Sequence, residues 1–130
     1  MKIIGIGTDI VLNNRIKKLI KNKNFLNRIY TNQEIKFAKK QKEISSFLAK
    51  RFAAKEAFAK ALGIGFRKNL NFKDIEILND KLGKPYYSIN SKLKKIIFRS
   101  LKVKNLDFFL SLSDEKLYSI AFVIIQKKWN

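Results

Sequence analysis

The chain has 130 residues, of which 46% are hydrophobic, so we expect residues 1–130 to form a single domain with its own core. It contains no cysteine and no histidine, which excludes disulfides, thiolate metal sites, cysteine nucleophiles and histidine bases. Its net charge of +19 favours a polyanionic partner such as a nucleic acid, an acidic protein or a phosphorylated cofactor, although an AT-biased genome produces the same excess of lysine.

The first half of the chain predicts one strand followed by four helices. Residues 3–8 read as a buried strand in which two glycines allow close backbone approach. The best-defined helix, over residues 45–62, is rich in alanine, leucine and lysine and ends before Gly63, a typical C-terminal stop. Three shorter helices are expected over residues 13–21, 23–30 and 31–42, the last of which opens with a capping-box pattern at Thr31 and Glu34.

The second half predicts two hairpins and one helix. The hairpins are expected to pair residues 74–78 with 86–89 and residues 108–113 with 117–126. Between them, Asn90 is suited to cap a helix that runs to about Leu101. Because strands and helices mix without regular alternation, the predicted fold class is α+β.

Two carboxylates lie in segments that are otherwise apolar or basic. Asp9 follows the predicted first strand, and Glu56 flanks the apolar stripe of the helix over residues 45–62. A buried carboxylate is costly unless a cation or hydrogen bonds compensate it. Each also has a structural alternative, since Asp9 can cap the next helix or form an Asx-turn and Glu56 can pair with Lys60 at spacing i,i+4.

Basic residues and glycines accompany these carboxylates. Arg51 and Lys55 fall inside the apolar stripe of the long helix, where a solvated surface does not explain them. Gly63 and Gly65 allow a backbone to approach a phosphate or a thin pantetheine-like chain, although Gly63 can equally be a simple helix stop.

Two later segments are weaker candidates for contacts to phosphate. Residues 83–85, Gly-Lys-Pro, read as a turn first and as a ligand contact second. Ser111 and Ser113 share one face of a predicted strand, where they either donate hydrogen bonds to a phosphate or face solvent.

The chemistry of the two carboxylates favours a divalent metal. Asp9 and Glu56 supply hard oxygen ligands, which together with substrate phosphates and water suit Mg²⁺ better than a softer metal. A metal that bridges a pyrophosphate neutralises the charge that develops on the leaving phosphate.

Five segments, in order and over nearly the whole chain, carry a family pattern: residues 5–11 with Arg15 and Ile16, and residues 47–63, 72–77, 83–86 and 111–115. The pattern resembles the holo-[acyl-carrier-protein] synthase family, the short-type 4′-phosphopantetheinyl transferases. The resemblance implies the 4′-phosphopantetheinyl transferase fold and a homotrimer with active sites between subunits. The implied Mg²⁺-dependent reaction transfers 4′-phosphopantetheine from coenzyme A, the co-substrate, to a serine of apo acyl carrier protein. It releases adenosine 3′,5′-bisphosphate and supports fatty acid biosynthesis.

The resemblance also implies roles for individual residues. It makes Asp9 and Glu56 metal ligands, and Glu56 and Lys60 catalytic residues. The implied contacts to coenzyme A are Arg51, Lys60, Gly63, Gly65, Lys84, Pro85 and Ser111. The basic helix over residues 13–21 is implied to dock the acidic acyl carrier protein through Arg15, Lys18 and Lys21, which gives the positive charge of the chain a partner.

The chain departs from the family pattern at two positions. Phe109 stands where family members often carry histidine, so metal-bound water, Glu56 or a substrate phosphate has to accept the serine proton. Ile64 stands where threonine is common, so one hydroxyl contact is missing. These departures affect the mechanism and the rate more than the class of reaction.

Two other interpretations remain open at this point. A small nucleic-acid-binding module would use the phenylalanines and lysines for stacking and phosphate contacts, but it gives Asp9 and Glu56 no role. A scaffold that trimerises without catalysis is disfavoured by the intact carboxylate pair. We expect no nucleic-acid or membrane partner and a cytoplasmic location, because no apolar run approaches the ~20 residues of a membrane span and no signal peptide is recognisable.

Overall fold

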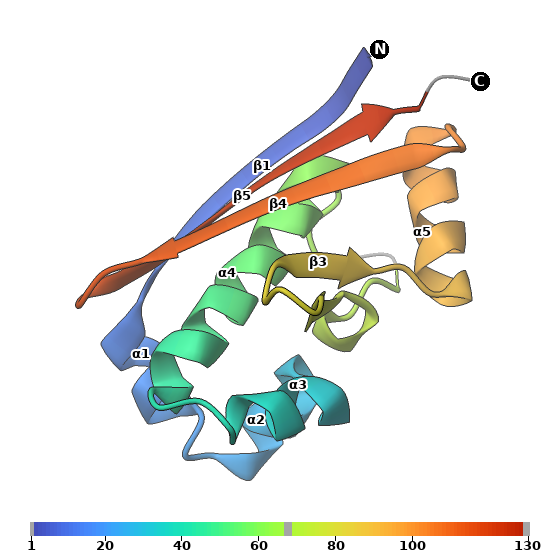
Figure 1. The fold of residues 1–130 in the computed structure, drawn as a ribbon. Helices are drawn as coiled ribbons and strands as arrows, with labels where there is room; N and C mark the ends of the chain where they lie inside the picture. Colours follow the sequence, from blue (N-terminus) through green and yellow to red (C-terminus); the bar gives the residue numbers. More distant parts are fainter. Residues whose placement is uncertain (1, 67–68, 129–130) are drawn as a thin grey trace.

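The computed structural model describes residues 2–66 and 69–128 and confirms the predicted α+β class (Figure 1). A three-stranded antiparallel sheet covers one side of the long helix α4 (Ile44–Leu62), and a two-stranded hairpin covers another side. Three short helices lie at one end of α4 and one helix lies near its other end. Within the described residues, no helix is long and apolar enough to span a membrane.

The larger sheet joins the N-terminal strand to the C-terminal hairpin. Its order is β1 (Lys2–Leu12), β5 (Tyr118–Lys127) and β4 (Leu106–Asp114), so β5 is the central strand. The register places Asp9 opposite Ala121 and Ser111 opposite Phe122. The predicted C-terminal hairpin is thereby confirmed: the first strand is longer than expected at both ends, and the second is shifted by one residue.

Two glycines bring β1 into direct contact with α4. A Cβ added to Gly5 would overlap the carbonyl oxygen of Ala61, and a Cβ added to Gly7 would overlap that of Ala57. The alternation of a strand places Gly5, Gly7 and Asp9 on the same face of β1, toward the helix. The close approach that the glycines permit therefore carries Asp9 to the surface of α4.

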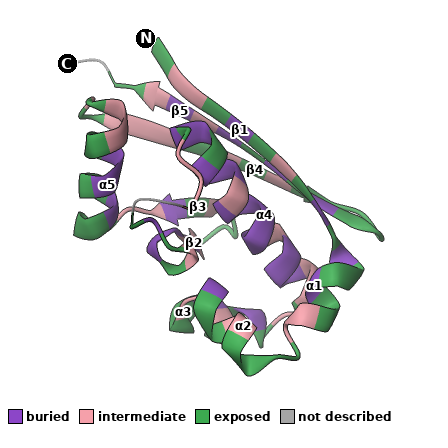
Figure 2. Ribbon diagram, turned by 180° about the vertical axis from the view of Figure 1, so that it is seen from behind, coloured by how far each residue is buried: buried purple, intermediate pink, exposed green. Residues whose placement is uncertain are grey.

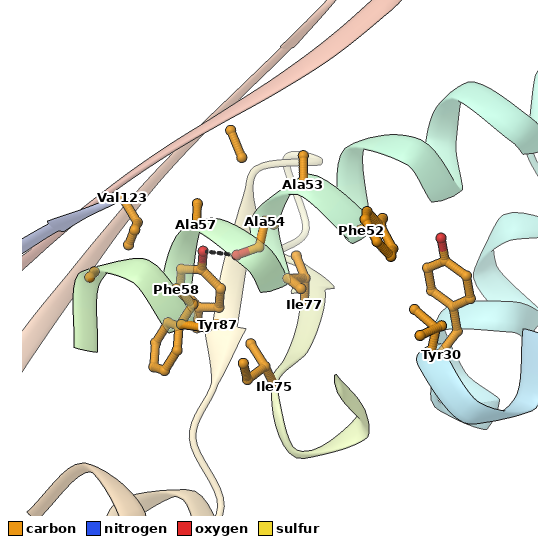
Figure 3. Packing of buried hydrophobic residues seen from close by; sticks show 14 of the residues in the cluster. Tyr30, Phe52, Ala53, Ala54, Ala57, Phe58, Ile75, Ile77, Tyr87 and Val123 are labelled. Atoms are coloured by element: carbon orange, nitrogen blue, oxygen red, sulfur yellow. Dashed lines mark hydrogen bonds between the residues drawn. The ribbon is translucent and has the colours of Figure 1, made fainter. Parts of the chain in front are cut away.

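The core forms where α4 passes between the sheet and the smaller hairpin, β2 (Glu76–Asn79) with β3 (Pro85–Ser88). Figure 3 shows Phe58 of α4 packed against Tyr87 of β3, with ring centroids 4.7 Å apart. The Tyr87 hydroxyl donates a hydrogen bond of 2.7 Å to the carbonyl oxygen of Ala54, so the buried phenol is satisfied. Buried alanines on α4 leave room for this close packing.

The N-terminal helices form where they were predicted but are shorter than expected. They are α1 (Asn13–Leu19), α2 (Lys23–Ile29) and α3 (Asn32–Ala38). The capping box at the start of α3 is confirmed, since Thr31 accepts from the amide of Glu34 and Glu34 accepts from the amide of Thr31. The helix ends at Ala38 rather than near residue 42 because the segment after it is polar and has no side chain to bury.

The later elements also begin close to their predicted positions. A 3-10 turn (Phe72–Asp74) precedes β2, since Asp74 accepts a hydrogen bond from the amide of Asn71, and the strand therefore starts at Glu76. Helix α5 (Ser91–Leu101) is capped by the side chain of Asn90, as expected.

The outer face of the three-stranded sheet contradicts the expectation that the first strand is buried. Helix α4 covers only one face of the sheet, so the side chains on the other face remain accessible (Figure 2). This outer face carries Ile6, Ile10, Leu12, Phe109, Tyr118, Ile120 and Phe122, which are all between 38% and 59% exposed. An apolar sequence pattern marks the strand but does not say which of its faces the rest of the chain covers.

Candidate active site

Asp9, Glu56 and Lys60 form one site where β1 contacts α4. The ammonium of Lys60 lies 3.0 Å from Oδ1 of Asp9 and donates a second bond of 3.0 Å to the carbonyl oxygen of Thr8. The Asp9 side chain is 16% exposed and that of Lys60 is 54% exposed, so the pair lies at the mouth of the site. Lys60 therefore clamps the end of α4 to β1 beside the carboxylates.

Glu56 lies next to this pair without a cation of its own. Desolvation, and to a smaller degree the charge of Asp9, raises its pKa, while Lys60 and Arg15 act in the opposite direction. Within the described part of the chain, neither the Glu56 carboxylate nor Oδ2 of Asp9 accepts a hydrogen bond or an ion pair. The site thus holds accessible carboxylate oxygens that lack a protein partner.

The structural alternatives for both acids are wrong. The N-cap of α1 is Leu12, with no side-chain capping bond, so Asp9 does not cap the helix after β1. Lys60 pairs with Asp9 instead of making the i,i+4 pair with Glu56. The two carboxylates are therefore not explained by local helix chemistry.

Arg15, predicted to dock the carrier protein, also lies close enough to the carboxylates to act on Glu56. Its guanidinium carbon is 5.8 Å from the ring centroid of Phe52, and its charge acts on Glu56. Lys17, Lys18 and Lys21 are exposed around the same helix, so α1 offers a basic surface beside the site.

A cavity of about 540 Å³ lies along the first half of α4, and four of the predicted coenzyme A contacts line it. These are Arg51, Lys84, Pro85 and Ser111. Arg51 is buried, with its guanidinium 3.9 Å from the ring centroid of Phe47, and burial lowers its pKa to about 10. It remains charged at neutral pH, and its Nε has no hydrogen-bond partner among the described residues.

Sequence reasoning missed Asn79, which fixes one wall of this cavity. Its side-chain oxygen accepts a hydrogen bond from Arg51, and its amide nitrogen donates 2.8 Å to the carbonyl oxygen of Gly83. Asp80 accepts from the amide of Lys84 and so closes the turn. The only available signal was the position of Asn79 at the end of a predicted strand, which is not specific.

Lys55 belongs to the core and not to the site. Its ammonium lies 2.8 Å from Oε1 of Glu34 and also donates to the carbonyl oxygens of Phe72 and Ile75. Both side chains of the pair are fully buried. The charge inside the apolar stripe is thus explained by a buried ion pair that joins α3 to α4.

The remaining predicted coenzyme A contacts lie at the other end of α4. Gly63 ends the helix in the left-handed conformation, with φ of 79°, and Gly65 follows with φ of 62°. Lys60 lies nine residues, or about 14 Å, along the helix from Arg51. One chain therefore divides the seven predicted contacts between two places.

Comparisons with known proteins identify the family of the chain. The model of the 4′-phosphopantetheinyl transferase superfamily matches residues 5–123. The holo-[acyl-carrier-protein] synthase of Pelagibacter ubique is 59% identical over 98% of this chain and 100% of its own length. The crystal structure of the Neisseria meningitidis synthase aligns with a TM-score of 0.84 at 41% identity, covering 97% of this chain and all of that one.

A third relative was solved with a ligand. The Bacillus anthracis synthase, in complex with coenzyme A (3′,5′-ADP), aligns with a TM-score of 0.79 at 37% identity, covering 97% of this chain and 98% of that one. These matches define the fold as that of a phosphopantetheinyl transferase. The chain belongs to the holo-[acyl-carrier-protein] synthase family, and it is an enzyme.

Proposed function

We propose that the chain transfers the 4′-phosphopantetheine group of coenzyme A to a serine of apo acyl carrier protein in a Mg²⁺-dependent reaction. The serine oxygen attacks the phosphorus that bears the pantetheine arm, and the bond to the bridging oxygen breaks, so adenosine 3′,5′-bisphosphate leaves. The observation that carries the proposal is the junction of β1 and α4, where Asp9 and Glu56 meet beside Lys60. Membership of the synthase family supports the choice of substrates.

The residues present fit a Mg²⁺ ion. Oδ2 of Asp9 and the Glu56 carboxylate accept no bond within the described residues, and Asp9 raises the pKa of Glu56, so a divalent cation would relieve a real repulsion. The described residues contain no cluster of three or more metal-binding side chains, so substrate phosphate and water have to complete the coordination. When bound, Mg²⁺ would neutralise charge on the leaving phosphate.

Three residues of the chain have distinct roles in this proposal. Lys60 adds a positive charge beside the phosphates and holds Asp9 in place through its 3.0 Å contact. Glu56 would hold the Mg²⁺ ion together with Asp9, and because the chain has no histidine, the serine proton passes to Glu56, to water or to a substrate phosphate. Arg51 is buried, its Nε has no hydrogen-bond partner among the described residues, and it would contact the phosphates of a coenzyme A molecule bound in the cavity that it lines.

The transfer is tested by weighing the carrier protein after incubation with the enzyme, coenzyme A and Mg²⁺. Asp9→Asn and Glu56→Gln should each slow the transfer at least ~10²-fold, which is typical for loss of an electrostatic stabiliser of a transition state. Mg²⁺ should raise the melting temperature of the wild type but not that of Asp9→Asn. Glu43→Gln, a change in an exposed carboxylate outside the site, is the matched control. Near-normal rates in both folded variants would refute the metal assignment.

We also propose that the active unit is a homotrimer with active sites between subunits. Two features support it: the exposed apolar outer face of the sheet, and the division of the coenzyme A contacts between two places on one chain. A neighbouring subunit that covers this face would bury the apolar side chains, each worth about 1.5–3 kcal/mol when fully buried. A cyclic arrangement closes without leaving a free copy of the face.

A matched pair of variants tests the assembly. Ile120, on the outer face, is 42% exposed, and Ile44, at the start of α4, is 40% exposed. Ile120→Lys should dissociate the trimer in light scattering and abolish transfer, whereas Ile44→Lys should leave both intact. An active wild-type monomer at working concentration would contradict the proposal.

The carrier protein is proposed to dock on the basic surface of α1 by electrostatic steering. Arg15 acts on Glu56, so Lys18→Glu separates docking from chemistry more cleanly than Arg15→Glu. Lys18→Glu and raised salt should both increase the KM for the carrier with little change in kcat, since exposed charges act over about 10 Å at 0.1 M salt. Lys95→Glu on α5 is the control. A KM that is unchanged by salt and by Lys18→Glu would place docking elsewhere.

A role in fatty acid biosynthesis and a cytoplasmic location stay predictions, which rest on the family resemblance and on the sequence.

A further inference from the structure

A second cavity, of about 450 Å³, lies between α5 and the ends of β4 and β5. Its size falls within the ~300–1,000 Å³ that is usual for small-molecule sites. It is remote from the carboxylate site, because Leu106 in its wall pairs with Lys127 whereas Asp9 pairs with Ala121, six residues or about 20 Å away along β5. The function proposed above uses none of its residues. Its apolar lining consists of Ile89, Ile97, Phe98, Val103, Leu106 and Phe108.

Lysines surround this apolar lining. Lys94, Lys104 and Lys128 also contribute to the cavity wall. Lys128 is paired with Asp107 at 3.4 Å, but within the described ranges neither Lys94 nor Lys104 forms an ion pair. The ammonium of Lys104 lies 5.3 Å from the ring centroid of Phe98, which holds a cation beside the apolar wall.

The loop that closes the cavity is fixed at both ends. The amide of Lys102 donates a bond of 2.8 Å to the carbonyl oxygen of Phe98, and the amide of Lys128 donates a bond of 2.7 Å to that of Asn105. Lys102 and Asn105 both take the left-handed conformation, so the loop turns sharply twice within four residues. The wall of the cavity is therefore held in place by hydrogen bonds of the chain itself.

We propose that this cavity binds an amphiphilic anion, with an unbranched hydrocarbon chain against the apolar lining and a carboxylate head at Lys94 and Lys104. A neutral apolar ligand would leave the two ammonium groups unused. An inorganic anion would leave the apolar lining unused, and a nucleic-acid strand is too wide to enter a cavity of this size. Only a ligand with both parts matches the whole wall.

Three probes that differ in charge and in chain length test the proposal by calorimetric titration of the full-length protein. Octanoate should bind saturably with one site per chain. Octanol, which has the chain without the charge, should bind about 2- to 5-fold more weakly, the factor expected for loss of an exposed ionic contact. Acetate, which has the charge without the chain, should show no binding in the same range, because each buried methylene contributes about 0.8 kcal/mol.

Variants locate the site. Lys94→Glu and Lys104→Glu should each weaken octanoate binding about 2- to 5-fold, and Phe98→Ala, at an exposed position of the wall, should also weaken it. Lys95→Glu makes the same change in net charge on α5 but lies in a different surface hollow, so it should bind octanoate like the wild type. All four variants should keep their transfer activity in the absence of octanoate, because the strand positions that line the cavity lie about 13–20 Å along the sheet from that of Asp9.

Three results would overturn the proposal. The first is no saturable binding of octanoate by the folded wild type. The second is binding of octanol as tightly as octanoate, which would mean apolar partitioning alone. The third is an equal loss of octanoate affinity in Lys95→Glu and Lys104→Glu, which would mean that the overall charge of the protein attracts the anion.

Discussion

Lys55 and Lys60 lie five residues apart on α4, and each contacts one carboxylate from another element. The Lys55–Glu34 pair is fully buried and is enclosed by backbone carbonyl and amide groups that satisfy both charges. The Lys60–Asp9 pair lies at the surface, with side chains 54% and 16% exposed, and leaves carboxylate oxygens available beside it. The same kind of contact is structural in one place and accessible to a ligand in the other.

The two ion pairs differ in how deeply they are buried and in how many hydrogen bonds their carboxylates accept. Glu34 accepts from Lys55 and from the amides of Thr31 and Ile77, so both of its oxygens have partners, and its burial keeps a substrate away. Desolvation lowers the pKa of Lys55, and the charge of Glu34 opposes this effect. A charged side chain inside an apolar stripe is therefore no indication of catalysis until its partners are known.

The largest expected effect comes from breaking the buried pair. Lys55→Met leaves the Glu34 carboxylate buried without its cation, which should lower the free energy of unfolding by about 3–5 kcal/mol. The double variant Lys55→Met with Glu34→Leu should recover much of this loss, because it removes both charges. Urea unfolding at one fixed protein concentration measures both changes. If Lys55→Met lowers the free energy of unfolding no more than the same change at an exposed lysine does, the pair does not hold α3 against α4.

A smaller effect on stability and a larger one on catalysis are expected from breaking the exposed pair. Lys60→Met should change the free energy of unfolding by at most about 1 kcal/mol, because exposed ion pairs contribute little. It should nevertheless slow transfer about 10²-fold, since it removes a positive charge beside the reacting phosphates. Lys95→Met is the control for loss of one lysine. Equal losses of stability in Lys55→Met and Lys60→Met would remove the contrast between the two pairs.

The smallest expected effect is a pH dependence from Glu56. Its pKa is raised on folding, so the folded state binds the proton more tightly and gains stability at pH below the unfolded pKa. That gain is lost as the pH rises through the raised pKa. In the absence of Mg²⁺, the wild type should therefore lose stability relative to Glu56→Gln as the pH rises from about 4, the pKa of an unfolded glutamate, through the raised pKa of the folded state. Urea unfolding at several pH values measures this, and a constant difference between the two proteins would contradict it.

The elements that the sequence predicted best are those fixed by neighbouring residues. The capping box of Thr31 and Glu34, the cap at Asn90 and the stop at Gly63 all form as expected, because each bond joins residues a few positions apart. The two carboxylates of the site were also recognised from the sequence, since an acid in an apolar or basic segment requires compensation. What the sequence could not supply was the identity of the compensating partners.

Those partners were decided by tertiary structure. Glu34 caps α3 and also neutralises Lys55, 21 residues away, and Lys60 pairs with Asp9, 51 residues away. The exposed outer face of the sheet likewise follows from the fact that α4 covers only one side. Local hydrogen bonds depend on residues close in sequence, whereas these pairings depend on how β1 and α3 pack against α4, and that packing is set by the whole chain at once.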